Sequence, residues 1–325
     1  MSCKCVKVLP VDGESTRVTL DSLEILNHEY KILSHEGHLY IPITEDGTPP
    51  SDMDVVYMDL LPNKNRLLPS DLLPFKITYE RLGDIILLDE PDAHQATAAT
   101  IALLASDIQF KTILNKASEI QGNTRVRKWS LLSGNSTETV HKEYGFEFLV
   151  DISKVYFSPR LVTERQRVTG QVCSGERVFD MFSGIGPFTV PIASKGATVT
   201  ATDINDDAIE YLRKNISRNN VETNVTAHTG DVRNIADEYS HWADRIIMNL
   251  PHSANDFLDV AFNIAGKKCI LHYYSISELD DPFTADISVL QNVSQEHEVT
   301  ILNETIIRSY SSSQVHICID ALLTR

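Results

Sequence analysis

The stretch Asp180-Met-Phe-Ser-Gly-Ile-Gly-Pro-Phe188 decides the fold of this chain. It starts within the apolar run Val178–Phe182 and leads into a helical stretch. Two glycines, Gly184 and Gly186, let the loop backbone approach a ligand, and Pro187 suits the first position of the following helix. A strand, a glycine-containing loop and a helix in this order are typical of an open α/β sheet, in which ligands bind beyond the carboxyl ends of the strands.

A regular alternation of strands and helices surrounds this loop and predicts parallel βαβ units. The expected strands are Val178–Phe182, Thr198–Ile204, Asn224–His228, Arg245–Met248 and Lys268–Tyr274, and the expected helices are Pro187–Lys195, Asp206–Asn219 and Ala254–Ala265. The last two apolar runs, Val299–Arg308 and Gln314–Leu323, are separated by only a short turn, so they are expected to form an antiparallel hairpin. We therefore expect an α/β, Rossmann-like parallel sheet that ends in an antiparallel hairpin.

Two smaller α+β segments precede this pattern, and the proline-containing stretch Asp59–Pro74 separates the first of them from the rest. Their expected elements are a helix at Leu20–Leu26, strands at His38–Ile43, Ile85–Leu88 and Glu147–Val150, and a helix from Asp92 to Ala105. The sequence therefore predicts three domains, at residues 1–62, 68–165 and 166–325.

Composition excludes several classes of protein. With 325 residues and a net charge of −16, the chain is not a uniformly basic nucleic-acid binder. Its five cysteines contain no Cys-x-x-Cys pair, so no metal site is expected. The longest strongly apolar stretch, Ala96–Ala105, is far shorter than the ~20 residues of a membrane span. No apolar signal core follows Met1, and a cytoplasmic protein is expected.

Acidic residues stand at three successive strand ends after the glycine loop: Asp180, Asp203 and Asp231. A single such residue is more often a solvated cap, but three together indicate a nucleoside site. Asp203 can accept both ribose hydroxyls, and Asp231 or its neighbouring amides can meet an adenine edge. Thr189 replaces the third glycine of G-x-G-x-x-G, which disfavours a pyrophosphate. This combination predicts a class I methyltransferase that uses S-adenosyl-L-methionine.

The fourth strand delivers the segment Met248-Asn-Leu-Pro-His252. Asn249 is expected at the strand tip facing the methyl donor, with Pro251 stiffening the exit, although Asn-x-Pro is also a common turn. His252 is as compatible with an ordinary loop histidine as with a substrate contact.

With these residues assembled, the chain resembles the archaeal and eukaryal family of tRNA (guanine-N1) methyltransferases acting at tRNA position 37, over nearly its whole length. The motifs that carry the resemblance are VYFSPRLVTER at 155–165, DMFSGIGPF at 180–188 and MNLPHSANDFLD at 248–259. The segment HKEYG at 141–145 is also similar, although Asn is expected in place of Tyr144. The resemblance implies S-adenosyl-L-methionine as methyl donor, tRNA as substrate, N1 of the guanosine 3′ to the anticodon as acceptor, and a monomer. It also implies that the N-terminal domain recognises tRNA and that the middle domain binds RNA.

Methylation of guanine N1 requires a base for the N1 proton and a donor for the charge that develops on O6. By match to the family motifs, Glu164 is the expected base, Arg125 holds O6 or a nearby phosphate with Arg127 as the alternative, and Tyr156 lies near the target base. Together with Asn249, these make up the expected catalytic set. The expected cofactor-binding residues are Arg160, Asp180, Phe182, Gly184, Gly186, Asp203, Asp231, Asn249 and Pro251.

Glu164 and Arg160 could instead form an exposed i,i+4 pair worth about 0.3 kcal/mol. An arginine in a first helical turn opposes the helix dipole, however, so Arg160 is better explained by an anion such as the carboxylate of the methionine moiety.

The distribution of charge indicates where RNA binds. Residues 1–110 and 171–325 each carry a net charge of −10, whereas residues 111–170 carry +4. Phosphate contacts are therefore expected in this middle stretch. The expected RNA-binding residues are Arg127, Lys128, Lys142, Arg165 and Arg167.

Two other functions remain open at this stage. A related enzyme of wybutosine-type tRNA modification transfers an aminocarboxypropyl group from the same cofactor, but the Asn-Leu-Pro at 249–251 favours methyl transfer. A catalytically silent RNA-binding protein would be expected to have lost the strand-end residues, which are all present.

Overall fold

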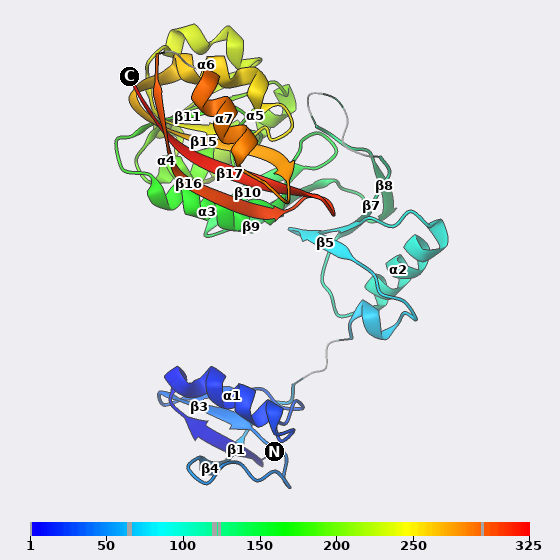
Figure 1. Ribbon diagram of the computed structural model, residues 1–325. Coiled ribbons are helices and arrows are strands. Elements are labelled where there is room, and N and C mark those ends of the chain that lie inside the picture. The colour runs from blue at the N-terminus through cyan, green and yellow to red at the C-terminus, as the bar shows by residue number, and fades with distance from the viewer. Residues whose placement is uncertain (1, 64–66, 119–121, 123–124, 294–295) are drawn as a thin grey trace. The chain divides into compact units, whose positions relative to one another are not determined.

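The structure is a computed structural model that describes residues 2–63, 67–118, 122, 125–293 and 296–325 (Figure 1). The chain divides into two compact units, residues 1–74 with 102–108, and residues 75–101 with 109–325. Within the described residues, no helix is long and apolar enough to span a membrane.

The first unit is a four-stranded antiparallel sheet with one helix. Its strands, in the order β2-β3-β1-β4, are Leu33–His35, His38–Pro42, Ser2–Val8 and Asp54–Asp59, and its helix α1 is Gly13–Ser22. The strand expected at His38–Ile43 is confirmed, but the helix expected at Leu20–Leu26 is wrong. The chain leaves the helix after Ser22, and Glu24 adopts a φ of +57° that turns the backbone away. Leu20, Asp21 and Ser22 belong to both ranges, and Leu20 packs in the core of this unit.

The second unit contains three sheets. Its first two sheets consist of β5 (Tyr79–Leu82), β6 (Ile85–Leu88), β7 (Thr112–Lys116) and β8 (Trp129–Ser133), and of β9 (Glu138–Glu143) and β10 (Phe146–Asp151). The expected strands at Ile85–Leu88 and Glu147–Val150 are thus confirmed. The helix expected at Asp92–Ala105 is present as α2, Ala93–Ala105.

The third sheet has seven strands in the order β13-β12-β11-β14-β15-β17-β16 (Figure 1). These strands are β11 (Arg177–Asp180), β12 (Thr198–Asp203), β13 (Val225–Thr229), β14 (Ala243–Met248), β15 (Ala265–Glu278), β16 (Glu298–Ser309) and β17 (Gln314–Thr324). The first five are parallel, and β17 pairs antiparallel with both β15 and β16. The predicted Rossmann-like sheet with an antiparallel end is confirmed.

Five helices accompany this sheet: α3 (Val162–Gln171), α4 (Thr189–Ser194), α5 (Asp206–Arg218), α6 (Leu258–Ile264) and α7 (Thr284–Val293). Helix α7 was not expected from the sequence. Helix α4 begins two residues after Pro187, so the prediction that Pro187 opens the helix is wrong. Asn205 caps α5 by accepting a hydrogen bond from the Asp207 amide, which fixes where the helix after β12 begins.

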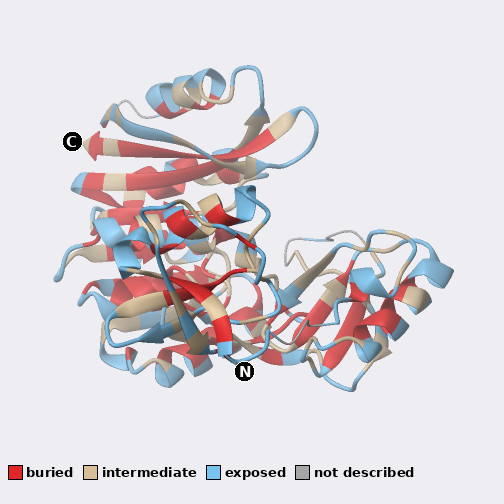
Figure 2. Ribbon diagram, turned by 90° about the horizontal axis from the view of Figure 1, so that it is seen from below, coloured by how far each residue is buried: buried red, intermediate tan, exposed pale blue. Residues whose placement is uncertain are grey.

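Two apolar cores enclose the seven-stranded sheet. One lies on the face covered by α3, α4 and α5, and it continues into β10 and the β5–β8 sheet. The other lies on the opposite face under α6 and α7. In Figure 2, the strand that runs to the C-terminus, β17, is drawn almost entirely in the colour of buried residues, as expected for a strand covered on both faces.

The turn between β9 and β10 explains one departure from the family motif. Glu143 pairs with Phe146, so Tyr144 and Gly145 form a two-residue hairpin loop, and both have positive φ, +46° and +89°. A turn of this kind favours Asn at its first position, because Asn tolerates the left-handed conformation better than Tyr does. Tyr144 therefore occupies the place for which Asn was expected without changing the turn.

Candidate active site

The glycine loop is held between the ends of β11 and β12. The amide of Gly184 donates to Oδ2 of Asp203 at 2.8 Å, and the amide of Asn205 donates to Oδ1 at 2.9 Å. Gly186 has a φ of +90°, and a Cβ there would collide with Cδ1 of Leu212. At Gly184 a Cβ would find no heavy atom nearer than the Tyr156 carbonyl oxygen, 3.9 Å away. The backbone favours glycine at both positions, since Gly184 has a φ of +54°, and the contact with Leu212 adds a packing reason only at Gly186.

Asp180, at the end of β11, is buried with unused hydrogen-bonding capacity. Its Oδ2 accepts from Oγ1 of Thr189 at 2.7 Å, but Oδ1 and the neighbouring Ser183 Oγ have no partner among the described residues. Burial, reinforced by the charge of Asp203, raises the pKa of Asp180 to about 7. A buried oxygen without a hydrogen-bond donor lowers the stability of the folded protein. The site therefore fits a ligand that brings hydroxyl or ammonium donors, as S-adenosyl-L-methionine would.

A second cluster lies at the end of β13. Asp231 caps the 3₁₀ turn Val232–Asn234 and forms an ion pair with Arg233, whose hydrogen bond lowers the pKa of the carboxyl. The Arg233 guanidinium lies 5.0 Å from the Phe257 ring, which meets Phe182 edge-on at 5.0 Å. The structure thus links two of the expected cofactor residues, Asp231 and Phe182. The carboxylate of Asp231 is therefore already engaged, by the Arg233 side chain and by the Arg233 amide.

Asn249 and Pro251 follow the end of β14, as expected, and both are partly exposed. The Pro251 carbonyl accepts from the amide of Ile276 at 3.2 Å, which ties this loop to β15. The His252 ring lies edge-on to Tyr310 at 5.4 Å, and partial desolvation of the ring, together with the charge of Arg125, lowers its pKa.

Glu164 lies on α3 and is buried, with 5% of its surface exposed. Arg167, one turn further along the helix, grips both of its oxygens at 2.7 Å, and the hydroxyl of Tyr274 donates to Oε1 at 2.8 Å. The alternative that Glu164 forms an exposed pair with Arg160 is therefore wrong. Arg160 is more than half exposed and donates to Glu80 at 3.1 Å, a contact that an anionic ligand would have to replace.

Arg125 and Tyr156 come together from distant parts of the chain. The guanidinium carbon of Arg125 lies 4.9 Å from the centre of the Tyr156 ring, a cation–π geometry. Arg125 also has a φ of +55°, a conformation that costs a non-glycine residue energy and is concentrated at functional sites. The rest of the motif at 122–127 is only partly described, since residues 123 and 124 lie outside the described residues.

Sequence reasoning missed His316, which lies on β17 beside this group. Its exposure is 3%, and neither ring nitrogen has a partner among the described residues. Burial, with the charges of Arg308, Arg125 and His252, lowers its pKa to about 3, so it is neutral at physiological pH. Its ring centre lies 6.0 Å from that of Tyr274, which carries the hydrogen bond to Glu164. The sequence offered one sign of it: polar residues, His316 among them, alternate with apolar residues along the expected strand Gln314–Leu323.

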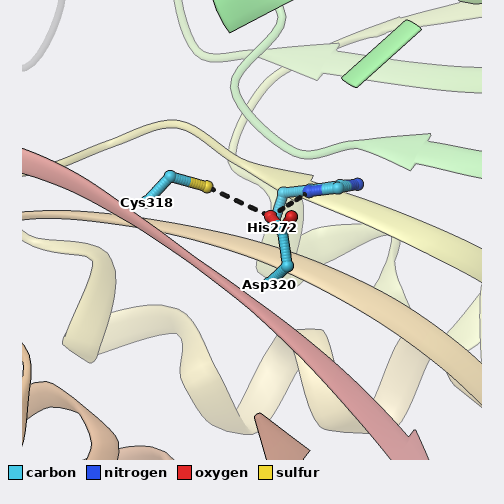
Figure 3. A group of neighbouring side chains, drawn as sticks. All are labelled: His272, Cys318 and Asp320. Atoms are coloured by element: carbon cyan, nitrogen blue, oxygen red, sulfur yellow. Dashed lines mark hydrogen bonds and ion pairs between the residues drawn. The ribbon is translucent and has the colours of Figure 1, made fainter. Parts of the chain in front are cut away.

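Behind Glu164 lies a group formed by His272, Cys318 and Asp320 (Figure 3). These ligand types could hold a metal, but both nitrogens of His272 are engaged, Nδ1 with Asp320 and Nε2 with Arg245, each at 2.7 Å. Arg167 occupies the carboxylate of Asp320. The guanidinium groups of Arg245 and Arg167 therefore take the positions that a metal cation would need. The group is an ion-pair network and not a metal site.

The residues expected to bind RNA separate into two groups. Lys128 is exposed, Arg127 lies over Trp129 at 5.6 Å, and Lys142 is exposed and paired with Glu147 at 2.7 Å. The prediction that Arg165 and Arg167 bind RNA is wrong, because carboxylates inside the protein already accept hydrogen bonds from both guanidinium groups. Arg165 is 3% exposed and donates to Glu143 from Nε at 2.9 Å.

Three family models match this chain in succession. Residues 5–48 match the tRNA methyltransferase 5 N-terminal domain, residues 64–137 the TYW2 N-terminal domain, and residues 139–302 the TRM5/TYW2 methyltransferase domain.

Individual proteins show the same similarity. The tRNA (guanine(37)-N(1))-methyltransferase Trm5b of Pyrococcus abyssi is 36% identical over 97% of each chain, and its crystal structure superposes with a TM-score of 0.74, covering 99% of this chain and 100% of that one. A solved complex of aTrm5 with tRNALeu is 31% identical, covers 99% of each chain and has a TM-score of 0.71. A tRNA(Phe) (4-demethylwyosine(37)-C(7)) aminocarboxypropyltransferase of Methanocaldococcus jannaschii is 30% identical over 77% of this chain and 99% of its own.

Proposed function

The chain belongs to the TRM5/TYW2 methyltransferase family, and on that premise we propose that it methylates N1 of the guanosine at tRNA position 37. The family membership confirms the resemblance that the motifs indicated. S-adenosyl-L-methionine, when bound, supplies the methyl group. The residues that would hold it are those around the glycine loop, where Asp180 and Ser183 each keep a buried oxygen that no described residue partners.

The extent of similarity carries this proposal. The Trm5b relative matches from end to end, including the N-terminal segment, whereas the aminocarboxypropyltransferase leaves about a quarter of this chain unmatched. The match of residues 5–48 to the tRNA methyltransferase 5 N-terminal domain supports the same choice. The match of residues 64–137 to a TYW2 domain keeps aminocarboxypropyl transfer as the second candidate.

We assign one task to each residue of the expected catalytic set. Glu164 takes the proton that N1 must lose before it can be methylated, since it is the one carboxylate that the family motif places here. Arg125 offsets the negative charge that then develops on O6, while its cation–π contact with Tyr156 fixes where the guanidinium lies. Asn249, which directly follows β14, would contact the acceptor guanine. Tyr156, whose backbone adjoins Gly184, joins this group to the cofactor loop.

We assign the remaining cofactor contacts from the expected set. Asp203 and Gly184 would hold the ribose, and Phe182 with the amides beside Asp231 would hold the adenine. Arg160 would exchange Glu80 for the carboxylate of the methionine moiety. Gly186 and Pro251 shape the loops around the ligand.

Phosphate binding is assigned to three cations of the middle stretch: the exposed Lys128 and Lys142 and the partly exposed Arg127. The expected boundaries at residues 1–62, 68–165 and 166–325 are proposed as a tRNA-recognition, an RNA-binding and a methyltransferase domain. The ranges of the three family models support this order. We further propose that the enzyme acts as a monomer, which sedimentation of the enzyme bound to tRNA would test.

The decisive experiment uses tRNA transcripts with G or A at position 37. Mass analysis should find the G37 transcript heavier by one methyl group, with the modification blocking Watson–Crick pairing. The A37 transcript should remain unmodified. A product heavier by an aminocarboxypropyl group would instead establish the second candidate, and equal modification of A37 would refute the guanine-N1 assignment.

The base is tested separately by Glu164→Gln. This variant should slow single-turnover methylation by at least ~100-fold, the size of a general-base contribution, while calorimetry shows cofactor affinity close to that of the wild type. An unchanged single-turnover rate would make Glu164 a structural residue.

A further inference from the structure

Glu164 is one end of a buried chain of charged groups that runs under α3. Arg167 donates to Glu164 from Nε and Nη2, and it also donates to Asp320, from Nη1 at 2.5 Å and from the shared Nη2 at 3.1 Å. Asp320 in turn accepts from Nδ1 of His272, and the other nitrogen of that ring accepts from Arg245. Arg245 donates to Glu176 at 2.7 Å, which ends the chain.

The registers of the strands explain how this chain is assembled. His272 lies opposite Asp320, and Tyr274 lies opposite Cys318, on neighbouring strands β15 and β17. Alternate residues of each strand face the same side, so all four side chains point toward α3. Helix α3 places Glu164 and Arg167 over this row, one turn apart. The titratable or charged groups that face Glu164 are Arg167 from α3, His272 and Tyr274 from β15, and His316, Cys318 and Asp320 from β17.

The ion pair with Arg167 should make Glu164 a weaker base. A carboxylate gripped by a guanidinium favours its ionised form and accepts protons poorly. Arg167, however, divides its single charge between two carboxylates. Burial alone would raise the pKa of Asp320, but the hydrogen bonds from His272 and Arg167 outweigh it and hold the pKa well below the ordinary value. Asp320 is therefore a permanent negative charge on the far side of Arg167.

Resting on the proposed function, we propose that Asp320 is a positioning residue for the base. It fixes the guanidinium of Arg167 so that Glu164 has one orientation, and it offsets the charge of Arg167 so that Glu164 keeps its affinity for the N1 proton. With His272 neutral, the chain from Glu164 to Glu176 carries one surplus negative charge. Transfer of one proton to Glu164 brings the buried network to neutrality, so the network stabilises the protonated product of the base step.

Asp320→Asn tests this inference. The variant keeps the shape of the side chain and leaves the charge of Arg167 to Glu164 alone. The pH at which single-turnover methylation reaches half its plateau should fall by about one unit, since a nearby uncompensated cation shifts a carboxyl by that order. The plateau itself should fall about tenfold, because a weaker base transfers the proton less readily.

A readout without cofactor or tRNA accompanies the rates. In protein labelled with ¹³C at the glutamate carboxyls, the Glu164 resonance is identified by its absence from Glu164→Gln. Its titration midpoint should move down in Asp320→Asn by the same amount as the rate profile. An unchanged or raised midpoint would overturn the inference.

Two further variants separate the proposal from a loss of folding. Glu176→Gln removes the same unit of charge at the far end of the network, beyond Arg245, and should lower the midpoint much less than Asp320→Asn does. Arg167→Met with Asp320→Asn removes the cation together with its balancing anion, so the midpoint should return at least to the wild-type value. A midpoint that stays low in the double variant would show that Arg167 does not mediate the effect.

The outcomes distinguish this inference from the proposed function. If Glu164→Gln leaves the rate unchanged, Glu164 is not the base and the proposed function loses its mechanism. If Glu164→Gln is slow but Asp320→Asn keeps the wild-type midpoint, the base stands and only the role of Asp320 is refuted.

Discussion

One buried acid in the parallel half of the seven-stranded sheet and one in its antiparallel half use their carboxylates in opposite ways. At the end of β11, Asp180 keeps a buried oxygen without a partner among the described residues, next to an unpartnered Ser183 hydroxyl. In the antiparallel half, Asp320 accepts hydrogen bonds on both oxygens, as does Glu164 on α3 above it. A carboxylate with a free acceptor oxygen suits the binding of a ligand that arrives from solution. A carboxylate whose oxygens both accept hydrogen bonds suits a reacting group that must keep one orientation.

The open carboxylate of Asp180 and the enclosed carboxylates of Glu164 and Asp320 lower the stability of the protein for different reasons. Leaving Asp180 open costs stability until a ligand supplies the missing donor. Enclosing Glu164 and Asp320 costs desolvation, which Arg167 offsets only while both pairs are intact. The first half of the sheet is therefore expected to respond to ligand and pH, and the second half to the loss of a partner.

The largest expected effect is the loss of Arg167. Arg167→Ala leaves two buried carboxylates without their cation and should lower the free energy of unfolding by about 3–5 kcal/mol. Arg177→Ala is the matched control, because its ion pair with Asp244 is far more exposed, and it should cost about 1 kcal/mol or less. Urea denaturation measures both. Equal costs would show that the two carboxylates of the antiparallel half do not depend on Arg167.

The two glycines of the loop should differ in what they affect. Gly186→Ala strains a positive φ and forces Cβ against Leu212, so it should cost about 1–3 kcal/mol of stability. Gly184→Ala strains a positive φ of +54° but meets no close neighbour, so it should cost less stability while weakening cofactor binding. Thermal melting with calorimetric titration of S-adenosyl-L-methionine separates these effects, and a larger loss of stability at Gly184 would contradict the assignment.

Asp180 should make cofactor binding depend on pH. Its pKa of about 7 means that it is mainly protonated below neutrality in the free protein. A cationic ligand requires the ionised form, so affinity should fall by close to tenfold for each pH unit below 7. Because this folded-state pKa lies above the unfolded value, the ligand-free protein should also lose stability as pH rises from about 4 to 7.

The comparison variant is Asp180→Asn. It should bind the cofactor weakly but with little pH dependence, which titration calorimetry at several pH values would reveal. A wild-type affinity that stays constant between pH 6 and 8 would remove Asp180 from the ligand site.

His316 gives the smallest expected effect. Its folded-state pKa of about 3 lies below the ordinary value of about 6.5, so the unfolded chain binds a proton that the folded protein refuses. The stability that neutral His316 contributes is present above pH 6.5 and is lost as pH falls toward 3. Between pH 7.5 and 5.5 the loss should be about 1 kcal/mol. His316→Gln should flatten this slope, whereas the exposed His94→Gln should not, and denaturation at both pH values decides.

The parallel half could be predicted from the sequence to a large extent. The strands β11, β12, β13 and β14 follow the expected ranges within one or two residues, because alternating apolar runs and short polar connections specify them locally. The strand-end residues follow from the same pattern, since the carboxyl ends of parallel strands meet at one edge. The predictions that Pro187 opens a helix and that Leu20–Leu26 is helical were wrong, because the ends of helices depend on packing beyond the local pattern.

The antiparallel half was predicted only as strands. Nothing near Asp320 or His272 in the sequence indicates that each is paired and buried, and polar residues at alternate positions of a strand usually face water. For the same reason Arg165 and Arg167 were expected to meet RNA, since a basic residue in a charged helix gives no sign of a carboxylate from a distant strand.

The sequence by itself determined the order of the strands and helices along the chain, the glycine loop, the strand-end acids and the family motifs. Each of these depends on neighbours within a few residues, through backbone conformation and the period of apolar side chains. Only the tertiary structure decided which charges are paired. Glu164 meets Tyr274 across 110 positions, and Arg167 meets Asp320 across 153. Such partners are set by sheet order and register, because burial makes an ion pair necessary but does not by itself choose the partner.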